Sequence, residues 1–335
     1  MTAVFLSRLL ITLVKASAFL LLLNKGHNFS EISIRFATVN LIVAFSHLNF
    51  YLINNFFINK GLRKGESYLG IHIKLIVLIS PIYKFVFSLT VAETLYILTS
   101  SLVNELTRQK ASCGSWDEIV FSLFKTSLFS FLLILTINPL SLEVYCGIFG
   151  ITNIWVLINN GIIKWLLAGH AKHEILEYLK IIVKNSYLYL YTCCLRYLEF
   201  TLKYISESSQ QIILVTYTFF VSNFILLFFD SILQRNLNDY TKNPDRYILL
   251  GKKILNKLKT LWLLILVGIF CLVAIWDKVN IYDIINTFGI LFTQLAIFFI
   301  NFYFYLSGKK KELLIFNLFI CLFCSLFNII RNGFG

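Results

Sequence analysis

The stretch WDEIVFSLFKTSLFS, residues 116–130, has acidic residues at its start and continues as an apolar run that extends to residue 137. About 20 helical residues cross the hydrocarbon core of a bilayer, with a range of roughly 17–25, so the run 119–137 is predicted to be a membrane helix. One positive charge, Lys125, lies inside it. Its ammonium either extends to the headgroups while its stem stays in hydrocarbon, or lines a polar path through the protein.

The composition of the whole chain is typical of a helical membrane protein. Its 335 residues are 58% hydrophobic, include 33 Phe and are only 14% charged, with a mean hydropathy of +0.77. A soluble domain of this size needs more charge to cover its surface. A β-barrel would show alternating segments of roughly ten residues in place of long apolar runs. We therefore predict an all-α polytopic integral membrane protein.

Ten apolar runs are candidate membrane segments. We predict about eight spanning helices and up to two partly inserted helices in a single transmembrane domain, residues 1–335. This layout is consistent with two pseudo-repeats, 1–168 and 186–335, joined by an amphipathic interfacial helix at 170–184, where apolar residues recur at helical spacing. The runs lie at about 5–24, 34–59, 68–101, 119–137, 140–168, 186–204, 212–233, 260–276, 281–307 and 312–330.

The net charge of +13 is carried largely by loops between apolar runs. This pattern indicates that the basic loops set the topology of the chain and contact anionic lipid headgroups. We expect no nucleic-acid partner. The basic loops 60–66 and 234–259 are both expected to be cytoplasmic. Five runs separate them, and an odd number of crossings cannot return the chain to the same side. We therefore expect one segment between 68 and 212 to be only partly inserted.

Motifs that indicate catalysis or metal binding are missing from the sequence. It contains no nucleophile elbow, P-loop or dinucleotide fingerprint. Cys321 and Cys324 have a CxxC spacing inside an apolar run, without the further ligands that zinc requires. His170 and His173 lie beside acidic residues, but a solvated interfacial face explains them better than a metal site. We predict a non-enzymatic protein with no catalytic residue, cofactor or metal.

Several ionisable residues fall inside apolar runs, where a charge near the bilayer centre costs about 2.5–3.5 kcal/mol on insertion scales. Arg196 and Glu199 are three residues apart and are expected to pair with each other. Glu93, Lys125 and Asp230 have no such neighbour. They are candidates either for a polar path or for anchoring helix packing.

Four segments resemble those of the XK-related proteins, a family of multi-pass membrane proteins that includes phospholipid scramblases. SPIYKF (80–85) is similar to a Pro-x-aromatic-basic-aromatic segment of that family, and Asp117 with LFKT (123–126) and Leu128 is similar to its Asp-x5-Leu-Phe-Glu-Thr-x-Leu segment. WVLINNGIIK (155–164) and LVGIFCLVAIW (266–276) resemble two further segments. This chain departs from the family by having Lys125 in place of glutamate.

This resemblance implies a scramblase-like protein in which lipid headgroups slide along a polar track while the acyl tails stay in the bilayer. It implies that Lys84, Glu93, Lys125 and Asp230 carry the charges of the track, with Trp155 in a packing or gating role. The expected partners are membrane phospholipids. A single-pass or other membrane protein is an additional candidate partner. We expect the protein in the plasma membrane in preference to the endoplasmic reticulum.

A second resemblance implies a different function. TFGILFTQL (287–295) is similar to the Thr-Tyr-x5-Gln-Phe signature of insect gustatory receptors, which are tetrameric ligand-gated cation channels. It implies a homotetramer, related in type to gustatory and odorant receptors, with a pore lined by the helix that carries Thr287 and Gln294. A third hypothesis is a non-catalytic membrane subunit whose polar residues contact a partner helix.

Overall fold

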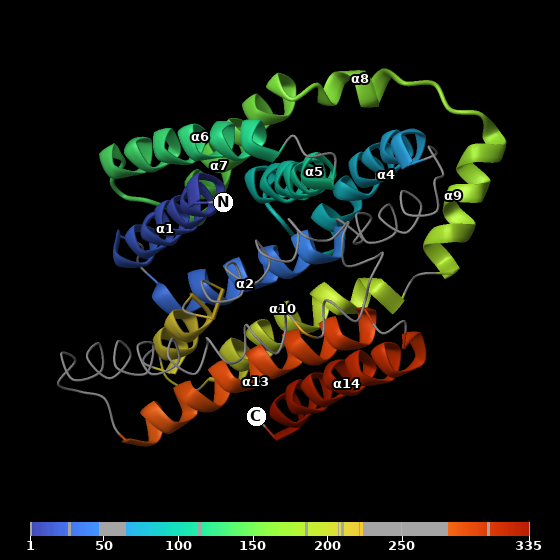
Figure 1. Ribbon diagram of the computed structural model, residues 1–335. Helices are drawn as coiled ribbons and strands as arrows, with labels where there is room; N and C mark the ends of the chain where they lie inside the picture. The colour runs from blue at the N-terminus through green and yellow to red at the C-terminus, as the bar shows by residue number, and fades with distance from the viewer. Residues whose placement is uncertain are drawn as a thin grey trace.

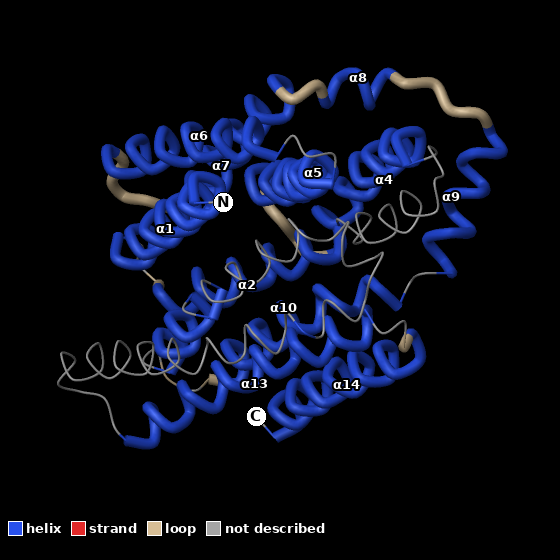
Figure 2. The backbone as a smooth tube through the Cα atoms, in the orientation of Figure 1, coloured by secondary structure: helices blue, strands red, loops and turns tan. Residues whose placement is uncertain are grey.

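The computed structural model describes residues 2–25, 28–46, 65–112, 116–184, 187–206, 208, 211–220, 222–223, 249, 281–306 and 309–334. Every regular element in this part of the chain is a helix (Figures 1 and 2), which confirms the predicted all-α class. The helices are α1 (Thr2–Lys25), α2 (Phe29–Ser46), α4 (Gly65–Val86), α5 (Val91–Ser112), α6 (Trp116–Thr136), α7 (Leu142–Asn159), α8 (Ile162–Leu167), α9 (Lys172–Lys184), α10 (Tyr187–Ile205), α13 (Ile281–Leu306) and α14 (Lys310–Phe334).

Five helices in the described part of the chain contain a segment long and apolar enough to cross a membrane, which supports a multi-pass integral membrane protein. The number of spans, predicted as about eight, stays a prediction, and run 260–276 lies outside the described residues. Shorter apolar helical segments occur at Leu9–Leu23, Gln211–Phe220 and Gly289–Asn301. The five candidate spans are Phe29–Ser46, Tyr68–Val86, Glu118–Thr136, Leu142–Asn159 and Lys310–Ile330.

The helices form two groups, with α2 between them (Figure 1). One group contains α1, α4, α5, α6 and α7, and the other contains α10, α13 and α14. Helix α2 packs against α5 of the first group and against α10 of the second, so the two sequence halves are in direct contact. Aromatic rings fill the core of the first group. Phe19 stacks on Phe36 at a centroid distance of 4.2 Å, and Tyr145 meets Phe36 edge-on at 5.5 Å.

Helices α5 and α7 approach each other closely through two glycines of α7. A Cβ atom added to Gly147 would lie 3.8 Å from the Cβ of Ala92, an ordinary contact. At Gly150 it would lie 3.2 Å from the Cγ of Leu95 and 3.4 Å from the backbone nitrogen of Tyr96. Small residues allow membrane helices to pack at such short range, because little hydrophobic force draws helices together in lipid.

The apolar run at 68–101, which we expected to be one segment, is two helices, and that prediction was wrong. Helix α4 ends at Val86 and α5 begins at Val91. Ser88 in the turn has a φ of +49°, and Thr90 caps α5 together with Glu93. Of the described helices between loops 60–66 and 234–259, α4, α6 and α7 contain candidate membrane spans. The partly inserted segment expected between 68 and 212 stays a prediction.

Helix α9 confirms that the expected amphipathic segment is helical. The run 140–168 is also divided, since α7 ends at Asn159 and α8 begins at Ile162. Gly161 between them has a φ of +80°, a conformation that favours glycine.

Candidate functional site

A groove of about 480 Å³ lies between α6 and α7. Lys125 and Trp155, which two separate sequence motifs singled out, both line it. The lining residues are Lys125, Thr126 and Phe129 of α6 together with Ile151, Thr152, Ile154, Trp155 and Ile158 of α7. The structure therefore brings together two of the five residues proposed for a polar track.

Local sequence explains why the two helices meet here. Ser141 caps α7 by accepting a hydrogen bond from the Val144 backbone N–H at 3.2 Å, so the helix begins directly after the short connection from α6. Farther from this connection, the hydroxyls of Ser130 on α6 and Thr152 on α7 lie 2.8 Å apart. Thr126 and Thr152 also donate to carbonyls one turn back in their own helices, which satisfies these hydroxyls without water.

Lys125 is an exposed cation within the candidate span Glu118–Thr136. Its Nζ lies 4.6 Å from the ring centroid of Phe121, a cation–π distance. Among the residues that the structure describes, no carboxylate pairs with it and no hydrogen-bond acceptor contacts it. Its charge is therefore available to an anionic group that enters the groove.

The depth of the groove follows from the helix positions. Lys125 follows Glu118 by seven residues, about 10 Å at 1.5 Å per residue, and Trp155 precedes Asn159 by four, about 6 Å. The short connection at 137–141 makes α6 and α7 antiparallel, so both positions lie toward the same end. Lys110 marks this end, because its ammonium binds the side-chain oxygen of Asn160 at 2.8 Å. Lys125 and Trp155 therefore lie toward the Lys110 end of their two candidate spans.

The wall of the groove is mostly apolar, and Lys125 is the one charged residue among the described residues that line it. Trp155 is 61% exposed and Phe129 is 56% exposed, and the isoleucines of α7 continue the apolar wall. One fixed cation beside an extended apolar surface is complementary to a ligand with an anionic head and a hydrocarbon chain. The indole can offer its N–H to the head while its ring contacts the chain.

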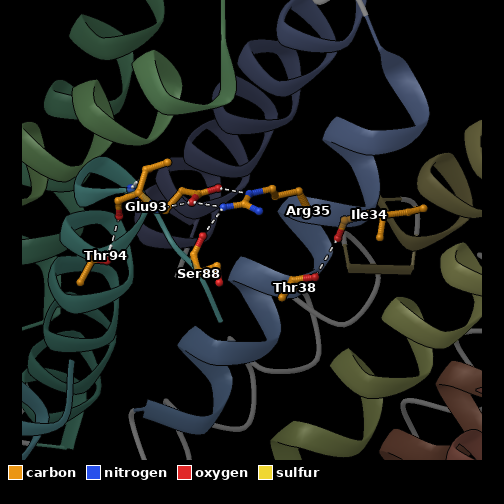
Figure 3. Close-up of polar contacts among 7 residues, drawn as sticks. Ile34, Arg35, Thr38, Ser88, Glu93 and Thr94 are labelled. Carbon is orange, nitrogen blue, oxygen red and sulfur yellow. Dashed lines mark hydrogen bonds and ion pairs between the residues drawn. The ribbon is translucent and has the colours of Figure 1, made fainter. Parts of the chain in front are cut away.

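Glu93 lies elsewhere, in a polar contact between α2 and α5 (Figure 3). Its carboxylate accepts hydrogen bonds from Arg35 Nε at 2.7 Å and from the terminal guanidinium nitrogen at 2.9 Å. The same terminal nitrogen donates to the carbonyl of Ser88 at 2.9 Å, and the Thr90 backbone N–H donates to Glu93 at 2.8 Å. Glu93 is 1% exposed. Its carboxylate is thus fully engaged and does not face the groove.

The other proposed track residues are not brought to the groove. Lys84 is half-buried in the last turn of α4, at the end where α5 begins, away from Lys110. Asp230 lies outside the described residues. Lys84, like Glu93, therefore belongs to the opposite end of the helix group, and its role in a track stays a prediction.

For the alternative pore, both residues are on α13, but the side chain of Thr287 lies outside the described part of the structure. Gln294 is 1% exposed. Neither its side-chain nitrogen nor its oxygen has a hydrogen-bond partner among the described residues. An unsatisfied buried amide is costly and often marks a functional position in a membrane helix.

Helix α10 carries a charged cluster that sequence reasoning found only in part. Arg196 contacts Glu199 at 2.8 Å, which confirms the expected pair. Lys203, which is 1% exposed, approaches the same carboxylate at 3.0 Å. Its position one turn after Glu199 was the signal that would have identified it.

His170 packs against α4 and is not placed as a metal ligand. A Cβ atom added to Gly70 would lie 2.7 Å from its Nε2. Burial lowers the pKa of His170 from its usual value near 6.5, the Lys74 ammonium lowers it further, and Glu174 opposes them. Within the described residues, no group of three or more His, Cys, Asp or Glu side chains could hold a metal ion.

Comparison of this chain with known protein families, with curated proteins and with solved structures finds no match. The function of the groove is therefore inferred from the residues that form it.

Proposed function

We propose that this protein moves phospholipids between the two leaflets of a membrane, in the manner of a scramblase, and that the α6–α7 groove is part of the headgroup path. The observation that carries the proposal is the meeting of Lys125 and Trp155 at one groove within candidate membrane spans. The function requires no covalent step and no cofactor.

The physical task is to lower the cost of moving a charged headgroup through hydrocarbon. An isolated charge is very costly in an apolar medium unless it is paired. The Lys125 ammonium supplies a partner for the lipid phosphate. The apolar wall that includes Phe129 and Trp155 accommodates the first part of the acyl chains, which otherwise stay in the bilayer.

Lys125 lies toward one end of its candidate span, so a complete track needs polar groups toward the other end. Lys84 and the Arg35–Glu93 pair lie near the α4–α5 turn, at the end of the helix group opposite to Lys110. We propose these groups as the second half of the track. Arg35 is the suitable member of the pair, since its side chain is 38% exposed while that of Glu93 is buried.

The proposal is tested by dithionite quenching of fluorescent lipid in liposomes that contain the purified protein. Wild-type protein should allow quenching of more than half of the label, because lipids from the inner leaflet reach the outer one. Lys125→Leu should slow this phase. The matched control is Lys164→Leu, which removes an exposed lysine over an aromatic ring, 5.7 Å from Trp165, outside the candidate spans. Quenching by wild-type protein that stops at half would refute the proposal.

A cation channel is the second candidate function, and the buried amide of Gln294 favours it. To line a pore in a tetramer, Gln294 would have to turn from its buried position toward the tetramer axis. The mass of the protein in mild detergent separates the two candidates. A tetramer together with ionic current that Gln294→Leu changes would favour the channel, and a monomer would exclude it.

A further inference from the structure

Helix α9 has one face packed on the protein and another apolar face that is uncovered. Tyr178 and Ile182 are buried in the core that includes α4. Other apolar side chains of α9 remain exposed in the described structure. These are Ile175 at 39%, Leu176 at 52%, Leu179 at 41% and Val183 at 72%. At 3.6 residues per turn they form one continuous stripe along the helix.

The contacts of α9 place it at the boundary of the apolar part of α4. The Tyr178 hydroxyl shares a hydrogen bond with Nδ1 of His72, and its ring centroid lies 5.9 Å from that of Tyr68. Just before α9, the Lys74 ammonium donates to the carbonyl of Ala168. Tyr68 is the first residue of the candidate span Tyr68–Val86. Helix α9 therefore lies at the depth where that span leaves the hydrocarbon.

The orientation of α9 is consistent with this depth. In Figure 1 it lies at the right-hand end of the bundle and runs across the direction of α10, α13 and α14. Helix α14 contains the candidate span Lys310–Ile330. A helix that runs across the spanning helices at their end lies along the membrane plane.

Charge on α9 indicates which surface it faces. Lys172, Lys180 and Lys184 are exposed, and the last two flank the apolar stripe on the side away from Tyr178. Lysines beside an apolar stripe are typical of helices that bind anionic lipid at the membrane interface. The same end of the helix group carries Lys110 and Lys164, and an excess of positive charge is characteristic of the cytoplasmic side.

We propose that α9 is an anionic-lipid-binding helix of the cytoplasmic leaflet. Its stripe of Ile175, Leu176, Leu179 and Val183 enters the boundary between headgroups and acyl chains, and Lys180 and Lys184 bind lipid phosphates. This role depends only on the membrane class of the protein. It holds whether or not the α6–α7 groove moves lipid.

The test uses the full chain with cysteine introduced at one position, labelled with an environment-sensitive fluorophore. Leu179→Cys reports on the stripe, and Val183→Cys repeats the measurement one turn later. His173→Cys is the matched control, because His173 is exposed on the same helix but outside the stripe. Unsubstituted protein, labelled in parallel, corrects for the native cysteines. Each protein is reconstituted in phosphatidylcholine vesicles with and without phosphatidylserine.

We expect lipids with a nitroxide near the top of the acyl chain to quench the labels at 179 and 183, and aqueous iodide to quench the label at 173. Phosphatidylserine should strengthen the lipid quenching. In the Lys180→Gln/Lys184→Gln variant this gain should be largely lost, because the two charges that attract phosphatidylserine are removed.

Equal quenching of all three labels by iodide would overturn the proposal. So would labels at 179 and 183 that neither iodide nor lipid quenches, because protein would then cover the stripe. Lipid quenching that does not respond to phosphatidylserine, or to removal of the two lysines, would overturn the binding of anionic lipid.

Discussion

Arg35 and Glu93 form a two-point ion pair that joins α2 to the first turn of α5, with N–O distances of 2.7 and 2.9 Å. The same carboxylate accepts from the Thr90 backbone N–H, and the same guanidinium donates to the Ser88 carbonyl (Figure 3). One pair thus holds both the α4–α5 turn and the helix that lies between the two helix groups.

Loss of Arg35 alone should destabilise the protein strongly. The Arg35→Met variant leaves the buried Glu93 carboxylate without its main partner, and an unpaired buried polar group costs roughly 1–3 kcal/mol of the free energy of unfolding. Unfolding in detergent can be followed with a thiol-reactive dye, since the thiols of Cys146 and Cys194 are buried. The double variant Arg35→Met/Glu93→Gln should recover part of the loss, because the neutral amide still accepts from Thr90. A double variant less stable than Arg35→Met would contradict this account.

Gly150→Ala should be more damaging than Gly147→Ala. Both changes favour the helix by about 1 kcal/mol through backbone entropy, so their difference isolates packing. The new methyl at Gly150 would be pressed against Leu95 and the Tyr96 backbone, whereas at Gly147 it would make an ordinary contact. Overpacking costs about 1–3 kcal/mol. The unfolding midpoints of the two variants should therefore differ in this order, and equal midpoints would show that α5 and α7 are not tightly packed at Gly150.

Asn301 and Asn317 should be energetically coupled. Each donates to the side-chain oxygen of the other, at 2.9 and 2.7 Å, between α13 and α14. Either single change to Leu leaves one buried amide without this partner and should cost about 1–2 kcal/mol. The double variant should cost less than the sum of the two single variants. Strict additivity in this double-mutant cycle would mean that the pair contributes no coupling energy.

Acidification should weaken the packing of His170 against α4. Burial, and to a lesser extent the Lys74 ammonium, lower the pKa of His170 in the folded protein, against the opposing effect of Glu174. Below pH of about 6.5 the unfolded chain therefore binds more protons than the folded one, and stability falls as the pH falls toward the lowered native value.

The measurement is the change in unfolding midpoint between neutral and mildly acidic pH, compared with His170→Gln. The variant cannot take up this proton, so its midpoint should fall less. Identical pH dependence in the two proteins would rule out a contribution from His170, and other titrating groups cancel in the comparison.

Much of the helical class could be predicted because apolar runs leave a clear composition signal, as at 119–137 and 312–330. The division of 68–101 could not be predicted from hydropathy, since residues 87–90 are not polar enough to interrupt the run. The Thr90-x-x-Glu93 spacing of a capping box was the available signal, and it was missed. The prediction treated Glu93 as an isolated charge because nothing in the sequence links it to Arg35, 58 residues earlier.

The groove could also not be predicted from the sequence. Lys125 and Trp155 were singled out separately, and hydropathy carries no information on which faces of α6 and α7 meet. The Ser130–Thr152 contact, which joins the two helices, involves two residues of common types with no distinctive spacing. The pairing of these two helix faces is a tertiary feature that only the three-dimensional structure gives.

Helix α14 supplies hydrogen-bond partners to polar side chains of α10 and α13, which precede it in the chain. Besides Asn317, its Ser325 lies 2.9 Å from the Tyr197 hydroxyl, and its Asn328 donates to Thr201 of α10. Because α14 follows α10 and α13 in the chain, a ribosome exposes those helices to the membrane while their polar groups still lack partners. A polypeptide that ended before Asn317 would leave these polar groups without partners in lipid. Truncated chains should therefore be recognised and degraded early by membrane quality control, so that only chains containing α14 accumulate.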